Sequence, residues 1–261
     1  MKILITNDDG IQAPGLQSLI RIAQNLTDPS NIWVVAPMVE QSGVGHCISY
    51  TAPMRVHQTA PQSYAIQGYP ADCVIAGLHE IAKEVEFDVV LSGVNAGNNS
   101  AENAAYSGTL GAAMEAALQG QLGIAVSQFF GPNNKHLANP YEAAEANGAA
   151  LIRAIIHIDK TRDTAAQYRS FYNVNIPPVA ANDVKGHRVV PQGRRPTGGM
   201  QSEAQTSPSG RKFIWIKGAP QHDPGVGETD VAVNVEGYIS VTPMRADFTD
   251  YTELQRIAAQ L

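Results

Sequence analysis

Side chains with oxygen atoms follow three apolar segments of this sequence, each at the point where the segment ends. In chain order they are Asp8, Asp9, Ser42 and Asn95. Carboxylate, hydroxyl and amide oxygens are the ligands that Mg²⁺, Mn²⁺ and Ca²⁺ prefer, whereas Zn²⁺ prefers His or Cys. None of the seven histidines has another histidine four positions away. The set favours a divalent ion held by oxygen atoms; a solvated acidic turn at Asp8 and Asp9 is the alternative.

A second group of polar residues stands where an Ala-rich segment begins. Tyr106 precedes Ser107, Gly108 and Thr109, and the pattern predicts a helix from there to about Leu118. The free N–H groups at the positive end of a helix bind oxyanions. A helix cap that binds no ligand is the alternative.

A divalent ion beside such a helix start would supply what hydrolysis of a phosphate ester requires, namely charge neutralisation, an oxyanion cradle and an activated water. Other phosphate chemistries lack their motifs. The sequence has no G-x-x-x-x-G-K-[ST], and no G-x-G-x-x-G follows the first apolar run. Neither Cys47 nor Cys73 has an arginine six positions later, and Asp8-Asp9 is not Asp-x-Asp. Metal-assisted hydrolysis without a covalent intermediate is what remains.

Apolar runs that are predicted to be buried strands alternate with segments of helical periodicity. The runs are Ile3–Ile5, Ile32–Pro37, Phe87–Leu91, Leu122–Val126 and Tyr172–Ile176. This alternation is typical of a three-layer α/β domain with a mostly parallel sheet, which we assign to residues 1–180. Ligands bind at the carboxyl ends of the strands in such sheets, so the polar residues that follow the runs are expected to meet there.

Two segments between these runs have features of their own. Ile48–Gln67 alternates and carries two prolines, which predicts a hairpin at the edge of the sheet or outside it. Asp72 is expected to cap a helix that extends through residues 77–82.

Residues 181–261 are expected to form a protruding hairpin and a C-terminal arm rather than an independent domain. A Gly-, Ser- and Pro-rich loop and the strand Lys212–Lys217 predict a β-hairpin excursion between residues 182 and 220. We interpret its arginines as part of a solvated loop with a mobile, basic tip; contact with an anionic substrate is the alternative. These arginines are Arg188, Arg194, Arg195 and Arg211.

The C-terminal segment is predicted to contain a strand at residues 237–243 and a final helix. The apolar residues of that helix are Leu254, Ile257, Ala258 and Leu261. An apolar terminal helix needs a surface to cover, on its own domain or on a neighbouring subunit, so oligomerisation is an expectation.

The composition is that of an ordinary globular protein. The chain has 261 residues, 44% hydrophobic and 16% charged, and a formal net charge of -6. This charge argues against a stable complex with nucleic acid or an anionic membrane. Two cysteines without metal-site spacing fit a reducing compartment. Since no apolar run has the roughly 20 residues of a membrane span, a cytoplasmic location is expected.

Six short motifs in a fixed order extend over nearly the whole chain. They are Ile3–Gly10, Val35–Pro37 with Gln41–Gly43, Ser92–Asn98, Tyr106–Thr109 with Ala112 and Ala113, Asn173–Pro177, and Thr229–Asp230 with Gly237–Pro243. With these motifs the chain resembles the SurE survival-protein family of metal-dependent 5′(3′)-nucleotidases. The resemblance implies hydrolysis of nucleoside monophosphates, a Rossmann-like core, a protruding hairpin, and a C-terminal arm exchanged between subunits of a homodimer or homotetramer. Residues 160–169 and 196–209 depart from the family pattern.

The resemblance also implies roles for individual residues. One divalent ion per subunit, Mg²⁺ or Mn²⁺, would be held by Asp8, Asp9, Ser42 and Asn95. The phosphate would lie beside Asn98, Ser107, Gly108 and Thr109.

As a hypothesis, the ion orients a water that attacks phosphorus in line. Asp8 or Asp9 would act as the base, and His222 or a second water would protonate the leaving group. The competing interpretation is a nucleotide-binding or regulatory protein that uses the same cleft without turnover. A metal-dependent glycosyltransferase is a third alternative, disfavoured because both acids follow the first strand.

Overall fold

The structure is a computed structural model that describes residues 1–160, 168–196, 199–218 and 220–261. Its strands are β1 Ile3–Thr6, β2 Ile32–Pro37, β3 Val56–Ala60, β4 Ser63–Ile66, β5 Val89–Ala96, β6 Gly123–Gln128, β7 Phe171–Ile176, β8 His187–Val189, β9 Gln201–Thr206, β10 Lys212–Lys217 and β11 Ile239–Met244. Its helices are α1 Pro14–Gln24, α2 Pro70–Ala76, α3 Gly108–Leu118, α4 Glu142–Asp159, α5 Asp230–Val235 and α6 Tyr251–Ala258, with the short turns η1 Pro29–Asn31, η2 Gly77–Ile81, η3 Ala101–Tyr106 and η4 Ala181–Asp183.

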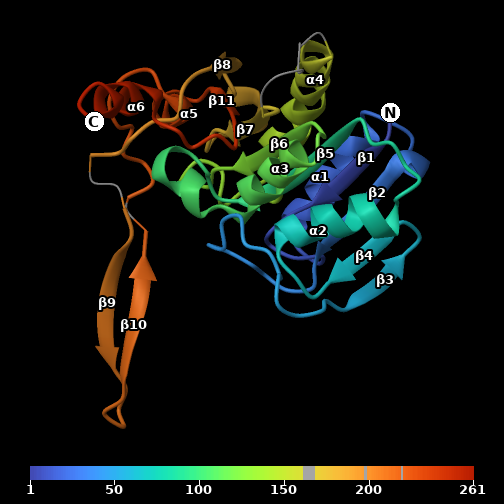
Figure 1. The fold of residues 1–261 in the computed structure, drawn as a ribbon, viewed down its shortest axis with the longest axis horizontal. Helices are drawn as coiled ribbons and strands as arrows, with labels where there is room; N and C mark the ends of the chain where they lie inside the picture. The colour runs from blue at the N-terminus through green and yellow to red at the C-terminus, as the bar shows by residue number, and fades with distance from the viewer. Residues whose placement is uncertain (161–167, 197–198, 219) are drawn as a thin grey trace.

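One large sheet organises the described part of the chain (Figure 1). Within those residues it has nine strands in the order β3-β4-β2-β1-β5-β6-β7-β11-β8. All pairs from β4 to β7 are parallel. β3 is antiparallel to β4 at one edge, and β11 is antiparallel to β7 near the other. The predicted α/β fold with a mostly parallel sheet is therefore confirmed, and β3 and β4 place the predicted hairpin at the sheet edge.

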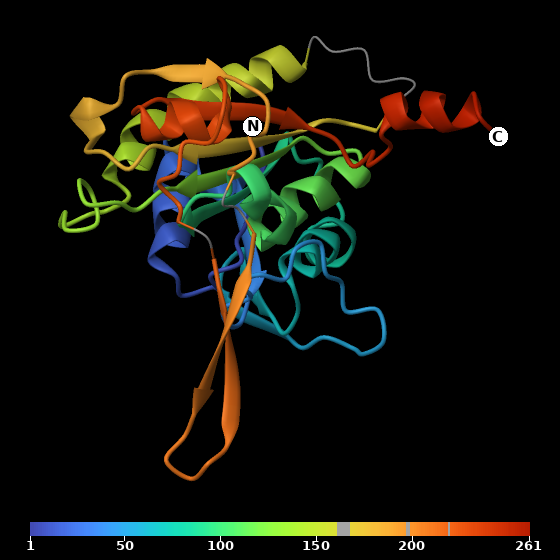
Figure 2. The same ribbon diagram turned by 90° about the vertical axis from the view of Figure 1, so that its left-hand side faces the viewer.

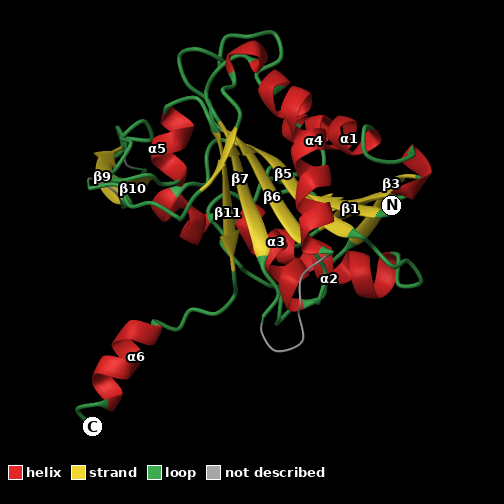
Figure 3. Cartoon of the chain, turned by 90° about the horizontal axis from the view of Figure 1, so that it is seen from above, coloured by secondary structure: helices red, strands yellow, loops and turns green. Residues whose placement is uncertain are grey.

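Helices cover both faces of this sheet, because successive side chains of a buried strand point to opposite faces. In β1, Ile3 and Ile5 belong to the cluster that includes α1 and α4, whereas Leu4 packs with α2 and α3. Figure 3 shows these helix pairs on opposite sides of the strands. At the start of α1, a Cβ on Gly15 would lie 1.9 Å from the carbonyl oxygen of Val94, so only glycine permits this close packing on β5.

Residues beyond 180 contribute to the sheet as well as leaving it. β11 pairs with β7, and β8 pairs with β11. β9 and β10 form a separate antiparallel hairpin that projects away from the sheet (Figures 1 and 2). A division of the chain at residue 180 stays a prediction.

The last helix, α6, lies apart from the sheet (Figure 3). Asp250 caps it by accepting hydrogen bonds from the amides of Thr252 and Glu253. None of its residues is buried. Within the described ranges, no helix combines the length and the apolar character that crossing a membrane would need.

The helix near Asp72 differs from the prediction in one detail. Helix α2 begins at Pro70, and Asp72 lies inside its first turn rather than at the cap position. The cap residue is Tyr69, whose amide donates a hydrogen bond of 2.8 Å to Oδ2 of Asp72. Pro70 explains the earlier start, because its fixed φ suits the first helical position.

Candidate active site

Three neighbouring parallel strands, β2, β1 and β5, end at one open pocket of about 550 Å³. Asp8 and Asp9 line it from the end of β1, Ser42 from the loop after β2, and Asn95 from β5. The four residues that were selected from the sequence as ion ligands therefore meet, because adjacent parallel strands bring their carboxyl ends to the same edge. The volume is in the range of small-molecule sites.

The turn after β1 presents the two carboxylates. Asn7 closes the turn, because its Nδ2 donates to the carbonyl of Gly10 at 2.9 Å and its Oδ1 accepts from the Gly10 amide at 3.2 Å. Gly10 has a φ of +100°, which glycine adopts readily. The carbonyl of Asp8 accepts from the Gln41 amide at 2.7 Å, which ties the turn to the loop that carries Ser42.

Asp8 is bound to the start of helix α3. The Thr109 hydroxyl donates to Oδ1 of Asp8 at 2.6 Å, and the amides of Gly108 and Thr109 also hydrogen-bond its carboxylate. Burial raises the pKa of Asp8, and these hydrogen bonds oppose the rise. A Cβ on Gly108 would lie 2.9 Å from Cβ of Asp8. In this structure Gly108 and Thr109 contact Asp8 and lie behind the pocket wall; their contact with phosphate stays a prediction.

The side chains of Asp9 and Asn95 both contact the backbone at the end of β5. The Ala96 amide donates to Oδ2 of Asp9 at 3.2 Å. Burial, and then the charge of Asp8, raise the pKa of Asp9 to about 6. Nδ2 of Asn95 donates to the carbonyl of Gly97 at 3.0 Å. The carbonyl of Gly97 can only accept a hydrogen bond, so the Asn95 atom that faces it is Nδ2. The other end of the amide, Oδ1, receives no hydrogen bond from the described parts of the chain and can serve as an oxygen ligand.

Ser42 is exposed at the rim of the pocket. Its hydroxyl donates to Oε1 of Glu40 at 2.7 Å. Glu40, which the sequence analysis did not select, also lines the pocket and contributes to the raised pKa of Asp9. The acidic character of the site thus extends to a third carboxylate.

Ser107 and Asn98 line the pocket on the side of helix α3. Ser107 caps this helix, because its Oγ accepts from the Leu110 amide at 3.1 Å. The Ser107 hydroxyl donates to no described residue, so its hydrogen is available to a ligand. Asn98 is 7% exposed. Both residues thus line the same pocket as the two acids, and their contact with phosphate stays a prediction.

Buried asparagines hold the loop that carries Asn98. The Asn99 amide donates to Oδ1 of Asn175 at 2.7 Å, and Nδ2 of Asn173 donates to the carbonyl of Asn99 at 2.9 Å. Nδ2 of Asn99 donates to Oγ of Ser127 at 2.8 Å. Strands β6 and β7 therefore anchor this loop.

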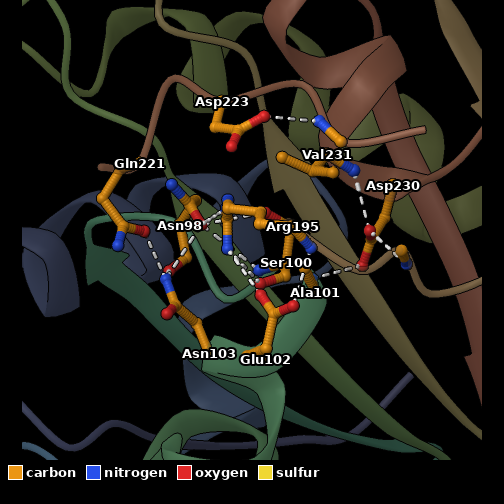
Figure 4. Close-up of polar contacts among 12 residues, drawn as sticks. Asn98, Ser100, Ala101, Glu102, Asn103, Arg195, Gln221, Asp223, Asp230 and Val231 are labelled. Atoms are coloured by element: carbon orange, nitrogen blue, oxygen red, sulfur yellow. Dashed lines mark hydrogen bonds and ion pairs between the residues drawn. The ribbon is translucent and has the colours of Figure 1, made fainter. Parts of the chain in front are cut away.

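Arg195 contradicts the interpretation of the arginines as a solvated, basic loop. Its side chain is only 1% exposed and lies behind Asn98 (Figure 4). Nη2 donates to Oδ1 of Asn98 at 3.2 Å and to Oγ of Ser100 at 3.0 Å. Nη1 donates to Oε2 of Glu102 at 3.4 Å. The sequence contains no local signal for this burial, because Arg195 and Asn98 are 97 residues apart.

Further pocket residues were missed by the sequence analysis. They are Asn103, Tyr106, Tyr141, Met200 and Gln221. Burial, and then the charge of Asp9, raise the pKa of Tyr141 to about 12. Gln221 and Met200 come from the two ends of the hairpin, so the base of the hairpin forms part of the wall.

His222, one of the two candidates for the leaving-group acid, is not among the described residues that line the pocket. Its ring packs on Phe129 with 4.6 Å between centroids. It also lies against Gly131, where a Cβ would be 2.9 Å from its Cε1. These contacts give His222 a packing role.

The residues around the pocket fit a divalent ion with oxygen ligands. The carboxylate of Asp8 is buried and the adjacent carboxylate of Asp9 is partly exposed, and two such charges side by side favour a compensating cation. Among the described lining residues there is no Lys, Arg or His. No cluster of three His, Cys, Asp or Glu side chains suited to a metal occurs in the described parts of the chain. An ion here would therefore rely on Asn95 and Ser42 in addition to the acids.

Comparison with known proteins agrees with this geometry. The family described as "Survival protein SurE" matches residues 3–198. The chain is 56% identical to the "5'-nucleotidase SurE" of Jannaschia sp. (strain CCS1), covering 98% of both chains, and 54% identical to the protein of the same description from Ruegeria pomeroyi, covering 100% of both. The crystal structure of the SurE protein from Aquifex aeolicus superposes with a TM-score of 0.80 at 32% identity, over 100% of this chain and 99% of that one. The chain belongs to the SurE family.

Proposed function

We propose that this protein is a divalent-metal-dependent phosphomonoesterase that hydrolyses nucleoside 5′-monophosphates, and also 3′-monophosphates, to nucleoside and phosphate. The observation that carries the proposal is the meeting of Asp8, Asp9, Asn95 and Ser42 in one pocket beside the start of helix α3. The description of the full-length relatives as 5′-nucleotidases supports the substrate class.

In this proposal Asp8, Asp9, Asn95 and Ser42 hold one divalent ion per subunit, Mg²⁺ or Mn²⁺. When bound, the ion supplies Lewis acidity and lowers the pKa of a water. The Asn95 amide fits this role because no residue that the structure describes donates a hydrogen bond to its Oδ1. Thr109 keeps Asp8 in place from behind, as a second ligand shell does in metal sites.

The substrate phosphate would lie between the acids and the start of helix α3, with Asn98, Ser107, Gly108 and Thr109 as its predicted partners. Ser107 donates through its hydroxyl, and Asn98 through its side-chain amide. Gly108 and Thr109 contribute the positive end of the helix, although their amides hydrogen-bond Asp8 in this structure. Asp8 or Asp9 accepts the proton of the attacking water, since both lie at the pocket.

The proposed setting is a homodimer or homotetramer in the cytoplasm. The exposed apolar face of α6 supports assembly through the C-terminal arm, since Leu254 is 53% and Ile257 is 41% exposed. Two free cysteines support a reducing compartment. The net charge of -6 argues against a stable nucleic-acid complex.

Phosphate release from a panel of 5′- and 3′-nucleoside monophosphates and an aryl phosphate tests the function, with Mg²⁺, with Mn²⁺ and after chelation. We expect release that requires the ion and favours nucleotides. Nucleotide binding without release under any ion would instead identify a regulatory binding protein.

A further inference from the structure

Arg195 is a buried cation directly behind the wall of the pocket. It lies on the segment between β8 and β9, and its side chain is 1% exposed. A buried guanidinium needs partners, and Arg195 finds them on the loop of Asn98, Ser100 and Glu102 (Figure 4). Its backbone amide also donates to Oε1 of Glu102 at 2.7 Å. The segment before the hairpin is thus attached to the wall at two points.

Arg195 and its neighbour Ser100 together determine which way the Asn98 amide faces. Oδ1 of Asn98 lies 3.2 Å from Nη2 of Arg195 and 3.4 Å from the Ser100 amide. Both of these groups can only donate, so the atom of Asn98 that faces them has to be the oxygen. Oγ of Ser100 and Nδ2 of Asn103 donate to the same oxygen, at 2.8 Å and 3.2 Å.

The other end of the Asn98 amide is therefore a free donor. Nδ2 of Asn98 donates to no described residue, and Asn98 lines the pocket. The described residues that line the pocket include no Lys, Arg or His. The buried side chain of Arg195 places a positive charge in the layer behind them. That charge polarises the Asn98 amide through the contact at Oδ1.

We infer that Arg195 is a positioning residue for phosphate binding. It holds the Asn98 side chain with Nδ2 toward the pocket, where a phosphoryl oxygen accepts a hydrogen bond from it. The inference rests on the proposed function, because it takes the phosphate to lie beside Asn98.

The test is a double-mutant cycle with Asn98→Ala, Arg195→Met and both together, measured by kcat, KM and competitive inhibition by inorganic phosphate. Arg195→Met is expected to weaken phosphate inhibition and kcat/KM about tenfold, which is the loss of about one hydrogen bond at 1.4 kcal/mol per factor of ten. In the Asn98→Ala background the same change is expected to alter both values less than twofold, because Arg195 acts through Asn98.

Two further variants allow the inference to be tested even if Arg195→Met folds poorly. Arg195→Lys retains the charge but lacks the planar fork, so it is expected to fall between wild type and Arg195→Met and to show the same dependence on Asn98. Arg188→Met is the matched control. Arg188 pairs with Glu228 at 3.2 Å and stacks over Tyr238 at 4.0 Å, outside the pocket, and its loss should leave phosphate inhibition unchanged.

The outcomes separate the inference from the function. If Arg195→Met reduced kcat/KM and phosphate inhibition by the same factor with and without Asn98→Ala, the positioning role would be wrong. The assignment of the phosphate site to Asn98 would not be affected by that result. If Asn98→Ala by itself changed neither kcat/KM nor phosphate inhibition, the assignment of phosphate to Asn98 would fall, and the inference with it.

Discussion

The hydroxyl of Thr109 donates a hydrogen bond of 2.6 Å to Oδ1 of Asp8. This contact joins the end of β1 to the start of α3, so the proposed ion ligands and the proposed phosphate cradle are parts of one hydrogen-bonded unit. Thr109 is fully buried, and its hydroxyl is committed to Asp8.

Replacing Thr109 by valine tests this link. Thr109→Val keeps the shape but leaves Asp8 without its hydroxyl donor. We expect half-maximal activation to require about 10-fold more Mn²⁺, since outer partners of metal ligands typically contribute 10- to 100-fold in metal affinity. A metal titration of activity measures this, with Thr59→Val on the exposed edge strand β3 as the control. Activation at the wild-type concentration would show that Thr109 does not support the ion.

Asp8→Asn should abolish most of the activity without unfolding the protein. Loss of the carboxylate removes one charged ligand of the proposed ion, so we expect turnover to fall by about 10²-fold or more. Circular dichroism should stay as in wild type, because Asn fits the same space. Turnover close to that of wild type would contradict the assignment of Asp8 to the metal site.

Asp9→Asn should stabilise the metal-free protein while it inactivates the enzyme. The pKa of Asp9 is raised from 3.8 to about 6, chiefly by burial and then by the charge of Asp8. A carboxyl whose folded pKa is raised destabilises the fold once it ionises, so the cost develops as pH rises from 3.8 to 6 and is complete above 6.

The shift corresponds to at most about 3 kcal/mol, and solvent screening of this partly exposed group reduces it to about 1 kcal/mol. In chelator at pH 7 the Tm of Asp9→Asn is thus expected to be about 2–4 °C above wild type, and the difference should vanish below pH 3.8. Glu84→Gln, an exposed substitution, is the control. A lower Tm for Asp9→Asn at pH 7 would show that Asp9 stabilises the metal-free fold.

Acid stability should depend on Glu115, which anchors the loop that follows Ser42. Oε2 of Glu115 lies 2.5 Å from Nε2 of His46, and Oε1 of Glu115 accepts a hydrogen bond of 2.7 Å from Nε2 of Gln119. Burial acts to raise the pKa of Glu115, but the hydrogen bonds from His46 and Gln119 outweigh it and hold the pKa below 4.5.

A depressed folded pKa stabilises the protein at pH values above 4.5, and this stabilisation is lost as pH falls through the folded value. The Tm of wild type should therefore fall more steeply below pH 4.5 than that of Glu115→Gln, as thermal unfolding over a pH series would measure. Glu80→Gln, at an exposed site, should follow wild type. Parallel curves for wild type and Glu115→Gln would exclude this contribution.

Charges on the apolar face of α6 should reduce the size of the assembly. Leu254→Asp and Ile257→Asp place a carboxylate on the face proposed to contact another subunit, and a buried unpaired charge is costly. Light scattering should then give a mass close to the 27.8 kDa of one chain. Gln255→Glu, on the same helix but outside its apolar residues, should keep the wild-type mass. An unchanged mass for both aspartate variants would place the interface elsewhere.

The predictable parts of the site are those with a local cause. An apolar run that stops at Asp8 is recognisable as a buried strand end, and Ser107 before an Ala-rich segment is recognisable as a helix start. The same logic was incomplete at Asp72, where the sequence did not show that the cap is Tyr69, three residues before Asp72.

Long-range contacts have no such local cause. Arg195 stands in a segment rich in Gly, Ser and Pro, a context typical of solvated loops, and its burial depends on partners 93 to 97 residues away. Gln221 reaches the pocket because the two ends of the hairpin lie together, and periodicity contains no information about that approach.

Hydrophobic periodicity and turn chemistry act between near neighbours, so the order of the main strands and helices and the polar residues at their ends were predictable from the sequence. Three relationships became known from the folded chain: the Asp8 carboxylate is bound to the start of α3, Nδ2 of Asn98 donates to no described residue, and Arg195 lies behind Asn98. Those relationships depend on which strands pair and how helices pack on them. The contacts that stabilise them join segments that are distant along the chain, so local sequence patterns do not reveal them.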